Sequence, residues 1–196
     1  MTAQIPDFFR LDNDEFELTA FQGQEIFSPS TLGLSPVAAT TACWRGFGCQ
    51  FGIIQNSLVL EELWVTNGEL IEGVFHPQPG PSIDGVTPDS GEKLGIFFNC
   101  RYCGLHLPVK FTGGILLGKE YLVDGYEWAA FKRPWQFQKV IELVFEAGKL
   151  IQMTNLSQIM CLVREQVEEK LLSPFIEERE QARSWIQKTY NLDYHF

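Results

Sequence analysis

The sequence predicts an α+β fold: an antiparallel β-sheet, or a partly closed barrel, followed by two C-terminal helices. Strand-like alternation and turn residues fill residues 1–153, whereas helical periodicity is confined to residues 154–191. No long helical segment separates consecutive strands, which argues against a parallel doubly wound sheet. A chain of 196 residues lies in the size range of one domain, so residues 1–196 are predicted to form a single domain.

The first half of the chain reads as strands and turns. Phe16–Ala20 alternates apolar and polar residues, and two longer strands are expected at Cys43–Ile54 and Leu58–Thr66. Asn67-Gly68 favours a two-residue type I′ turn. The following segment, Glu69–Phe75, is therefore predicted to pair back on the preceding strand.

The segment His76–Lys93 carries four prolines and three glycines, which predicts a long loop without a central strand or a helix. Such a loop serves as a lid or binding loop, or is simply mobile. A strand is expected at Leu107–Leu117. A later hairpin is expected to join Gln138–Phe145 to Lys149–Met153 through Glu146-Ala147-Gly148.

The helical part begins near Leu156. Its apolar residues recur at the spacing of one helix face: Leu156, Ile159, Met160, Val163, Val167 and Leu171. Ser173-Pro174 resembles an N-cap followed by proline at the first helical position. A second helix is therefore predicted over Pro174–Tyr190. Its expected buried residues are Phe175, Ala182, Trp185 and Ile186.

The chain is acidic, with 25 Asp and Glu against 15 Lys and Arg and a formal net charge of -10. No Lys/Arg patch is present, so no nucleic-acid partner is expected. An acidic surface favours a basic protein partner, although charge also serves solubility alone. The segment Met1–Asp7 has no basic region and no apolar run, and no stretch is long enough to span a bilayer. We therefore expect a soluble, cytoplasmic protein with no membrane contact and with reduced cysteines.

The segment Cys43–Ile53 is the most informative part of the sequence. If it is a strand, Gly46, Gly48 and Gly52 share one face with Trp44 and Gln50. These three glycines, here called the glycine trough, let a ligand or another part of the protein approach the backbone. The candidate ligand-binding residues are Trp44, Arg45, Gly46, Gly48 and Gln50.

Arg45 falls on the opposite face, beside aromatic residues and thiols. A guanidinium in the core needs a carboxylate or several carbonyls, and near a strand end it can reach water instead. Anion recognition is the functional alternative.

Cys43-Trp44-Arg45-Gly46-Phe47, followed by an apolar strand pair, resembles a pattern in uncharacterised bacterial protein families. The resemblance implies no activity and assigns no site residue.

Cys100-Arg101-Tyr102-Cys103-Gly104 has the C-x-x-C-G form of a zinc knuckle, with Cys100 and Cys103 as candidate metal ligands. A second C-x-x-C is absent, which leaves two ordinary buried cysteines as the alternative. A thioredoxin-like role fits less well, because such a motif starts a helix and this sequence resumes as a strand.

No nucleophile elbow, phosphate-binding loop or H-E-x-x-H motif occurs, and no cofactor is expected. The sequence therefore predicts a non-catalytic binding or protein-interaction domain with an acidic surface. One alternative is a small-molecule binder or enzyme that uses the glycine trough beside Trp44 and Arg45. The other is a fold stabilised by zinc through Cys100 and Cys103.

Overall fold

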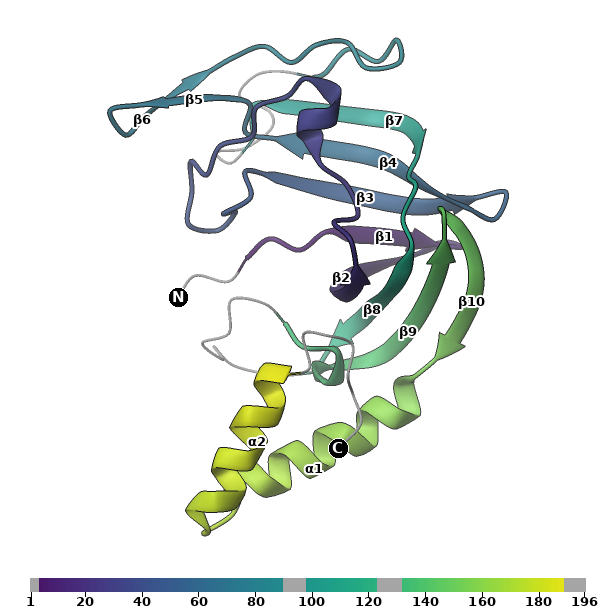
Figure 1. Ribbon diagram of the computed structural model, residues 1–196, viewed down its shortest axis with the longest axis vertical. Coiled ribbons are helices and arrows are strands. Elements are labelled where there is room, and N and C mark those ends of the chain that lie inside the picture. The colour runs from purple at the N-terminus through teal and green to yellow at the C-terminus, as the bar shows by residue number, and fades with distance from the viewer. Residues whose placement is uncertain (1–3, 90–97, 123–131, 189–196) are drawn as a thin grey trace.

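The computed structural model describes residues 4–89, 98–122 and 132–188 and confirms an α+β fold with two helices after the strands (Figure 1). Eight strands form one curved sheet in the order β10-β9-β8-β2-β1-β3-β4-β7. They are β1 (Phe8–Leu11), β2 (Asp14–Gly23), β3 (Phe47–Ile54), β4 (Ser57–Val65), β7 (Cys100–Pro108), β8 (Gly113–Tyr121), β9 (Phe137–Glu146) and β10 (Lys149–Asn155). Two short 3₁₀ helices lie at Pro29–Leu32 (η1) and Pro134–Gln136 (η3).

The large sheet is antiparallel except where β1 pairs with β3 in parallel. The sheet curls until β10 meets β4 through one residue pair, Lys149 and Ser57. The Lys149 Nζ also donates to Ser57 Oγ at 2.6 Å, and the Leu58 amide donates to the Gly148 carbonyl at 2.8 Å. The sheet therefore closes at one end, as a partly closed barrel does.

The inside of the curved sheet holds the main core. Phe9, Phe16, Phe51, Phe111 and Phe145 are almost completely buried there. The core is therefore rich in large aromatic rings, as the phenylalanine content of the sequence suggests.

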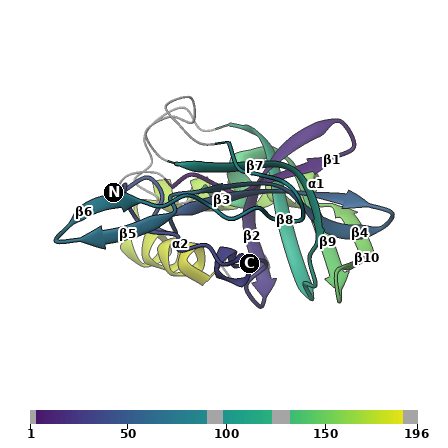
Figure 2. The ribbon, with the colours of Figure 1, turned by 90° about the horizontal axis from the view of Figure 1, so that it is seen from above.

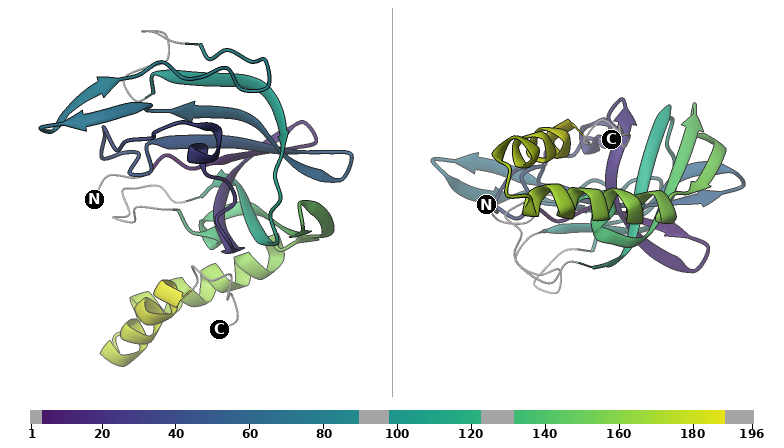
Figure 3. Two further views of the ribbon diagram at one scale, coloured as in Figure 1. Left: turned by 45° about the horizontal axis from the view of Figure 1, so that its top comes forward. Right: turned by 90° about the horizontal axis from the view of Figure 1, so that it is seen from below.

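The outer face of β8 and β9 is covered by α1 (Ser157–Leu172), so these two strands are buried on both sides (Figure 3). Along β8, Ile115 and Leu117 point into the barrel while Leu116 points toward the helix. The buried face of the helix consists of Met160, Val163 and Val167. These three positions of the expected helix face are confirmed and Leu171 is partly buried beside them, but Ile159 is exposed and does not belong to the buried face.

The second helix, α2 (Ile176–Lys188), packs beside α1. Ser173 Oγ accepts a hydrogen bond from the Phe175 amide at 3.1 Å, so the serine does cap this turn. Ala182 is buried as expected, but Phe175 is exposed and precedes the helix, which starts at Ile176. The side chains of Trp185 and Ile186 lie outside the described residues.

The predicted hairpin at Asn67-Gly68 is wrong. Instead β5 (Gly68–Ile71) pairs with β6 (Val74–Pro77), and these two strands form a separate small sheet. Their turn is Glu72-Gly73, where both residues have positive φ, 50° and 80°, as a type I′ turn requires.

Asn67 is buried and acts instead as a link between loops. Its Oδ1 accepts a hydrogen bond from the Ser35 amide at 2.7 Å. Its Nδ2 donates to the carbonyls of Gln78 and Pro79 at 3.1 and 3.3 Å. These partners lie 11 to 32 residues from Asn67 in the sequence, whereas a two-residue turn would pair only its immediate neighbours. The hydrogen bonds to these partners therefore override the local turn preference of Asn-Gly.

The strand predicted at Leu107–Leu117 is divided, because β7 ends at Pro108 and β8 starts at Gly113. The proline-rich segment after β6 packs on β7, with Ile83 in the main core. The buried Tyr102 hydroxyl donates to the Pro81 carbonyl at 2.9 Å. The described part of this loop, up to Asp89, therefore belongs to the fold and covers one side of the core.

Tyr102 makes the stability of the protein sensitive to alkaline pH. Burial raises the pKa of its phenol from 10.0 to about 12. Below pH 10 the phenol is neutral in both states, but above it the unfolded chain loses the proton first, so stability falls as pH rises from 10 toward 12. In an ultraviolet titration of the five tyrosines, we expect Tyr102→Phe to remove the last phenolate transition. An unchanged titration would contradict this assignment.

None of the described helices combines the length and the apolar character that crossing a membrane requires.

Candidate functional site

Trp44 and Arg45 lie in a turn and not in a strand, because β3 starts at Phe47. The turn is closed by a hydrogen bond from the Gly46 amide to the Cys43 carbonyl at 3.2 Å. Gly46 has a φ of 71°, a conformation that favours glycine. The predicted strand start at Cys43 is therefore corrected by four residues, and Trp44 projects into solvent with half of its surface exposed.

The glycine trough is filled by the protein itself. A Cβ on Gly46 would lie 2.5 Å from the Val37 carbonyl oxygen, and one on Gly48 would lie 3.5 Å from the Trp64 ring. The Glu61 carboxylate lies directly over Gly52. Gln50 lies between these two occupied positions and is buried. The structure therefore does not support an open trough for a ligand at Gly46, Gly48 and Gln50.

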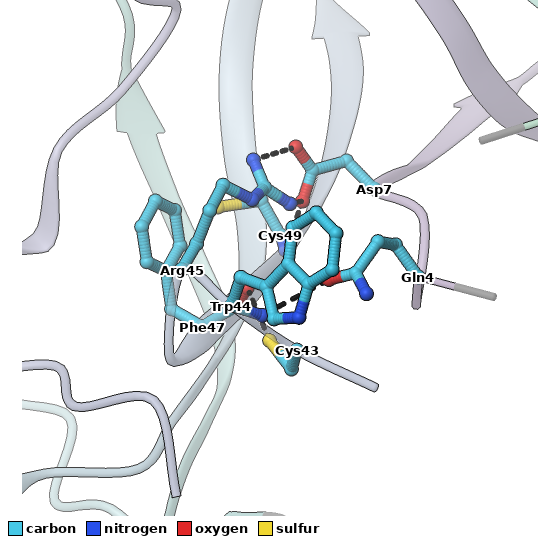
Figure 4. Close-up of polar contacts among 7 residues, drawn as sticks. All are labelled: Gln4, Asp7, Cys43, Trp44, Arg45, Phe47 and Cys49. Carbon is cyan, nitrogen blue, oxygen red and sulfur yellow. Dashed lines mark hydrogen bonds and ion pairs between the residues drawn. The ribbon is translucent and has the colours of Figure 1, made fainter. Parts of the chain in front are cut away.

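Arg45 forms a bidentate ion pair with Asp7 (Figure 4). The two terminal guanidinium nitrogens, Nη1 and Nη2, donate to the carboxylate at 2.8 Å, and the Cys49 amide donates to Asp7 Oδ1 at 2.9 Å. The guanidinium carbon lies 4.8 Å from the centre of the Phe47 ring. Burial lowers the pKa of Arg45, but the hydrogen bonds and charge of Asp7 outweigh it and raise the pKa above its ordinary value. Arg45 therefore stays charged and paired.

The N-terminal segment is held against this turn by further hydrogen bonds. The Ile5 amide donates to the Ala42 carbonyl at 2.8 Å. Gln4 bridges two residues: its Nε2 donates to the Thr41 carbonyl, and its Oε1 accepts from the Trp44 amide (Figure 4). Residues 4–7 therefore lie in a fixed position beside the turn that carries Arg45.

A pocket of about 310 Å³ opens where β2 diverges from this N-terminal segment. The Leu18 amide donates to the Asp7 carbonyl at 2.8 Å; β1 pairs with β2 only up to Glu17, whereas β8 pairs with β2 from Glu17 to Gly23. Most of the lining side chains are apolar, and Asp7 and Arg45 supply the charged ones. The lining residues are Ile5, Pro6, Asp7, Leu18, Thr19, Ala20, Phe21 and Arg45.

The chemistry of this pocket favours binding. Asp7 engages two of the five N–H donors of Arg45, and the guanidinium side chain is 43% exposed. A ligand can therefore accept a hydrogen bond from Arg45 while Asp7 neutralises the charge of the guanidinium. Burial raises the pKa of the nearby thiols of Cys43 and Cys49. Both thiols are therefore protonated at neutral pH and are poor nucleophiles.

Cys100 and Cys103 lie on opposite faces of β7. Residues three apart on a strand point to opposite sides, which places Cys100 in the core and exposes Cys103. Their sulfur atoms have different neighbours, the Gln78 carbonyl and the Glu62 carboxylate. In the described ranges, no three His, Cys, Asp or Glu side chains gather in a way that could hold a metal. This geometry does not bring the two thiols to one metal site.

Asp7 is the site residue that the sequence reasoning missed. It is the one carboxylate in the apolar run Ile5-Pro6-Asp7-Phe8-Phe9, and its side chain is only 9% exposed. A buried carboxylate requires a cation or hydrogen-bond donors, so an isolated acid in an apolar run is the signal that an arginine elsewhere in the chain pairs with it.

No protein-family model, curated protein or solved structure matches this chain. The resemblance of Cys43–Phe47 to uncharacterised bacterial families stays a prediction.

Proposed function

We propose that this protein is a non-catalytic binding domain that holds a small, mainly apolar molecule in the pocket beside Arg45. The observation that carries the proposal is the combination of apolar walls with one partly exposed guanidinium. Small-molecule sites typically combine apolar surfaces with a few fixed polar groups that orient the ligand. The pocket volume of about 310 Å³ lies at the lower end of the usual range for such sites, so the ligand is small.

The polar group of the ligand is a neutral hydrogen-bond acceptor, such as a ketone, ester or amide carbonyl. The Asp7 carboxylate already balances the charge of Arg45 at 2.8 Å. A second carboxylate at Arg45 would be repelled by Asp7, and a buried unbalanced charge is costly. A carbonyl oxygen accepts from the remaining N–H groups without adding charge. The ion pair thus favours a neutral ligand over the anion that Arg45 alone suggests.

A matched pair of ligands tests this proposal. We expect octan-2-one to shift the backbone NMR signals of residues 5–7, 18–21 and 45, with a Kd on the order of 0.1–1 mM. Octanoate, which has the same chain length and a charged end, is expected to bind at least about threefold more weakly. Tighter binding of octanoate would overturn the preference for a neutral acceptor. Signal shifts spread over the whole surface, or no shifts at all, would contradict ligand binding in this pocket.

Phe21→Ala tests whether the apolar wall contributes. Phe21 lines the pocket and is 40% exposed, so its truncation leaves the main core intact. We expect octan-2-one to bind about fivefold more weakly, since part of an aromatic contact is worth about 1 kcal/mol. The matched control is Ile54→Ala, because Ile54 is also 40% exposed but lies outside the pocket. Equal affinities for the two variants would contradict this role of Phe21.

A further inference from the structure

The β5–β6 hairpin projects beyond the large sheet (Figures 1 and 2). Within the described part of the chain its strand pairs join β5 only to β6, from Gly68 and Pro77 at the base to Ile71 and Val74 near the turn. Because no further strand pairs with it, the hairpin exposes backbone edges and side chains that the rest of the fold does not cover. A two-stranded hairpin on its own has marginal stability in water.

The end of the hairpin is apolar. Ile71 and Val74 are 50% and 60% exposed and lie opposite each other, so they form one cross-strand pair on one face. Leu70 is exposed on the other face. Exposed apolar side chains that lie together on one face, as Ile71 and Val74 do, mark a candidate contact surface.

The charges around this apolar end have one sign. Residues 46–92 contain no Lys or Arg, and their acids are Glu61, Glu62, Glu69, Glu72, Asp84, Asp89 and Glu92. Glu61 and Glu62 pair with arginines of β1 and β7. Glu69 lies on the face of Ile71 and Val74, opposite His76, and its Oε1 accepts a hydrogen bond from Gln78 Nε2 at 2.9 Å, whereas Glu72 lies in the turn. Among the described residues neither glutamate forms an ion pair with a Lys or Arg.

We propose that the β5–β6 hairpin is an interaction surface for a basic protein. Its apolar end inserts between apolar side chains of the partner, while Glu69 and Glu72 pair with the partner's Lys or Arg. The exposed edges of the hairpin allow an extended segment of the partner to add as a further strand. A second copy of this chain would bring the same acids together, and like charges oppose that contact. The occupant is therefore a basic segment of another protein.

The proposal is independent of the pocket at Arg45. None of the hairpin residues lines that pocket, and the base of the hairpin is held by Asn67, Ser35 and Gln78. Loss of one function therefore leaves the other intact, and the two proposals succeed or fail separately.

A short peptide that alternates lysine and valine is the probe, and one that alternates glutamate and valine is its control. We expect the lysine peptide to bind the protein and its affinity to fall at least about fivefold between about 50 and 300 mM NaCl. The double variant Ile71→Ser/Val74→Ser is expected to weaken binding about tenfold or more. The matched control is Leu162→Ser on α1, because Leu162 is similarly exposed at 54% but lies on another element. This variant should bind like the unchanged protein.

Several outcomes would overturn the proposal. Equal binding of the two peptides would remove the role of charge, and unchanged binding by the hairpin variant would remove the role of this surface. No binding of the lysine peptide at all would also count against it. The molar mass in solution tests the other occupant: a dimer that dissociates in the hairpin variant would make a second copy the partner.

Discussion

Gly46→Ala is expected to destabilise the protein by about 3 kcal/mol or more, a large part of the stability of one domain. The left-handed backbone of Gly46, with a φ of 71°, costs an alanine about 1–2 kcal/mol. The added Cβ would also lie 2.5–2.7 Å from backbone atoms of Val37, which cannot move without shifting the loop. Such crowding typically adds about 1–3 kcal/mol. Denaturant unfolding of the variant and the unchanged protein measures the sum.

Gly48→Ala is the matched control. Gly48 has no positive φ, and its added Cβ would lie 3.5 Å from the Trp64 ring, an ordinary van der Waals distance. We expect a change below about 1 kcal/mol. If Gly46→Ala were as stable as Gly48→Ala, the turn that separates Arg45 from β3 would be disproved.

Loss of the Asp7 carboxylate is expected to be nearly as costly. In Asp7→Ala the Cys49 amide loses its acceptor and Arg45 loses its counter-charge, with an expected cost of about 3 kcal/mol. Arg45→Ala should cost about 2–3 kcal/mol, since it leaves a buried carboxylate without its cation. The partial exposure of the guanidinium reduces this second value because water screens the pair.

The double variant Asp7→Ala/Arg45→Ala measures how much the interaction between the two side chains contributes to stability. Once both charges are gone, neither is left alone, so the combined cost should fall short of the sum by about 1–3 kcal/mol. Unfolding free energies of the four proteins give this coupling directly. A coupling near zero would mean that the two side chains stabilise the fold separately.

Local sequence patterns predicted several elements of the fold correctly. The hairpin predicted through Glu146-Ala147-Gly148 is present, with positive φ at Ala147 and Gly148 as its tight turn requires. The helix face at Met160, Val163 and Val167 is present as well. Both signals depend on neighbours a few residues apart, so the sequence alone contains them.

The candidate site depended on contacts that no local pattern contains. Asp7 and Arg45 are 38 residues apart, so no local pattern joins them. The Asn67 side chain bonds Ser35, 32 residues away, and Gln78 and Pro79, 11 and 12 residues away, and these contacts replace the tight turn that Asn-Gly favours. The parallel pairing of β1 with β3 also could not be predicted from the sequence, because a four-residue strand shows little periodicity.

The C-x-x-C motif shows how secondary structure changes the meaning of a spacing. In a turn or knuckle two cysteines three apart point to one centre. Continuous pairing of β7 with β4 at Cys100 and at Cys103 fixes an extended backbone there, and the same spacing then sends the thiols to opposite faces.

The strand order has a consequence for synthesis of the chain. β2 pairs with β1 on one side, but its other neighbour is β8, which comes some ninety residues later in the sequence. Until β8 emerges, the amides and carbonyls of β2 form an open edge beside an incomplete aromatic core. Open edges of this kind template pairing between chains, and late long-range pairing is slow. Fragments that end before Gly113 should therefore aggregate, and the growing chain depends on protection during that interval.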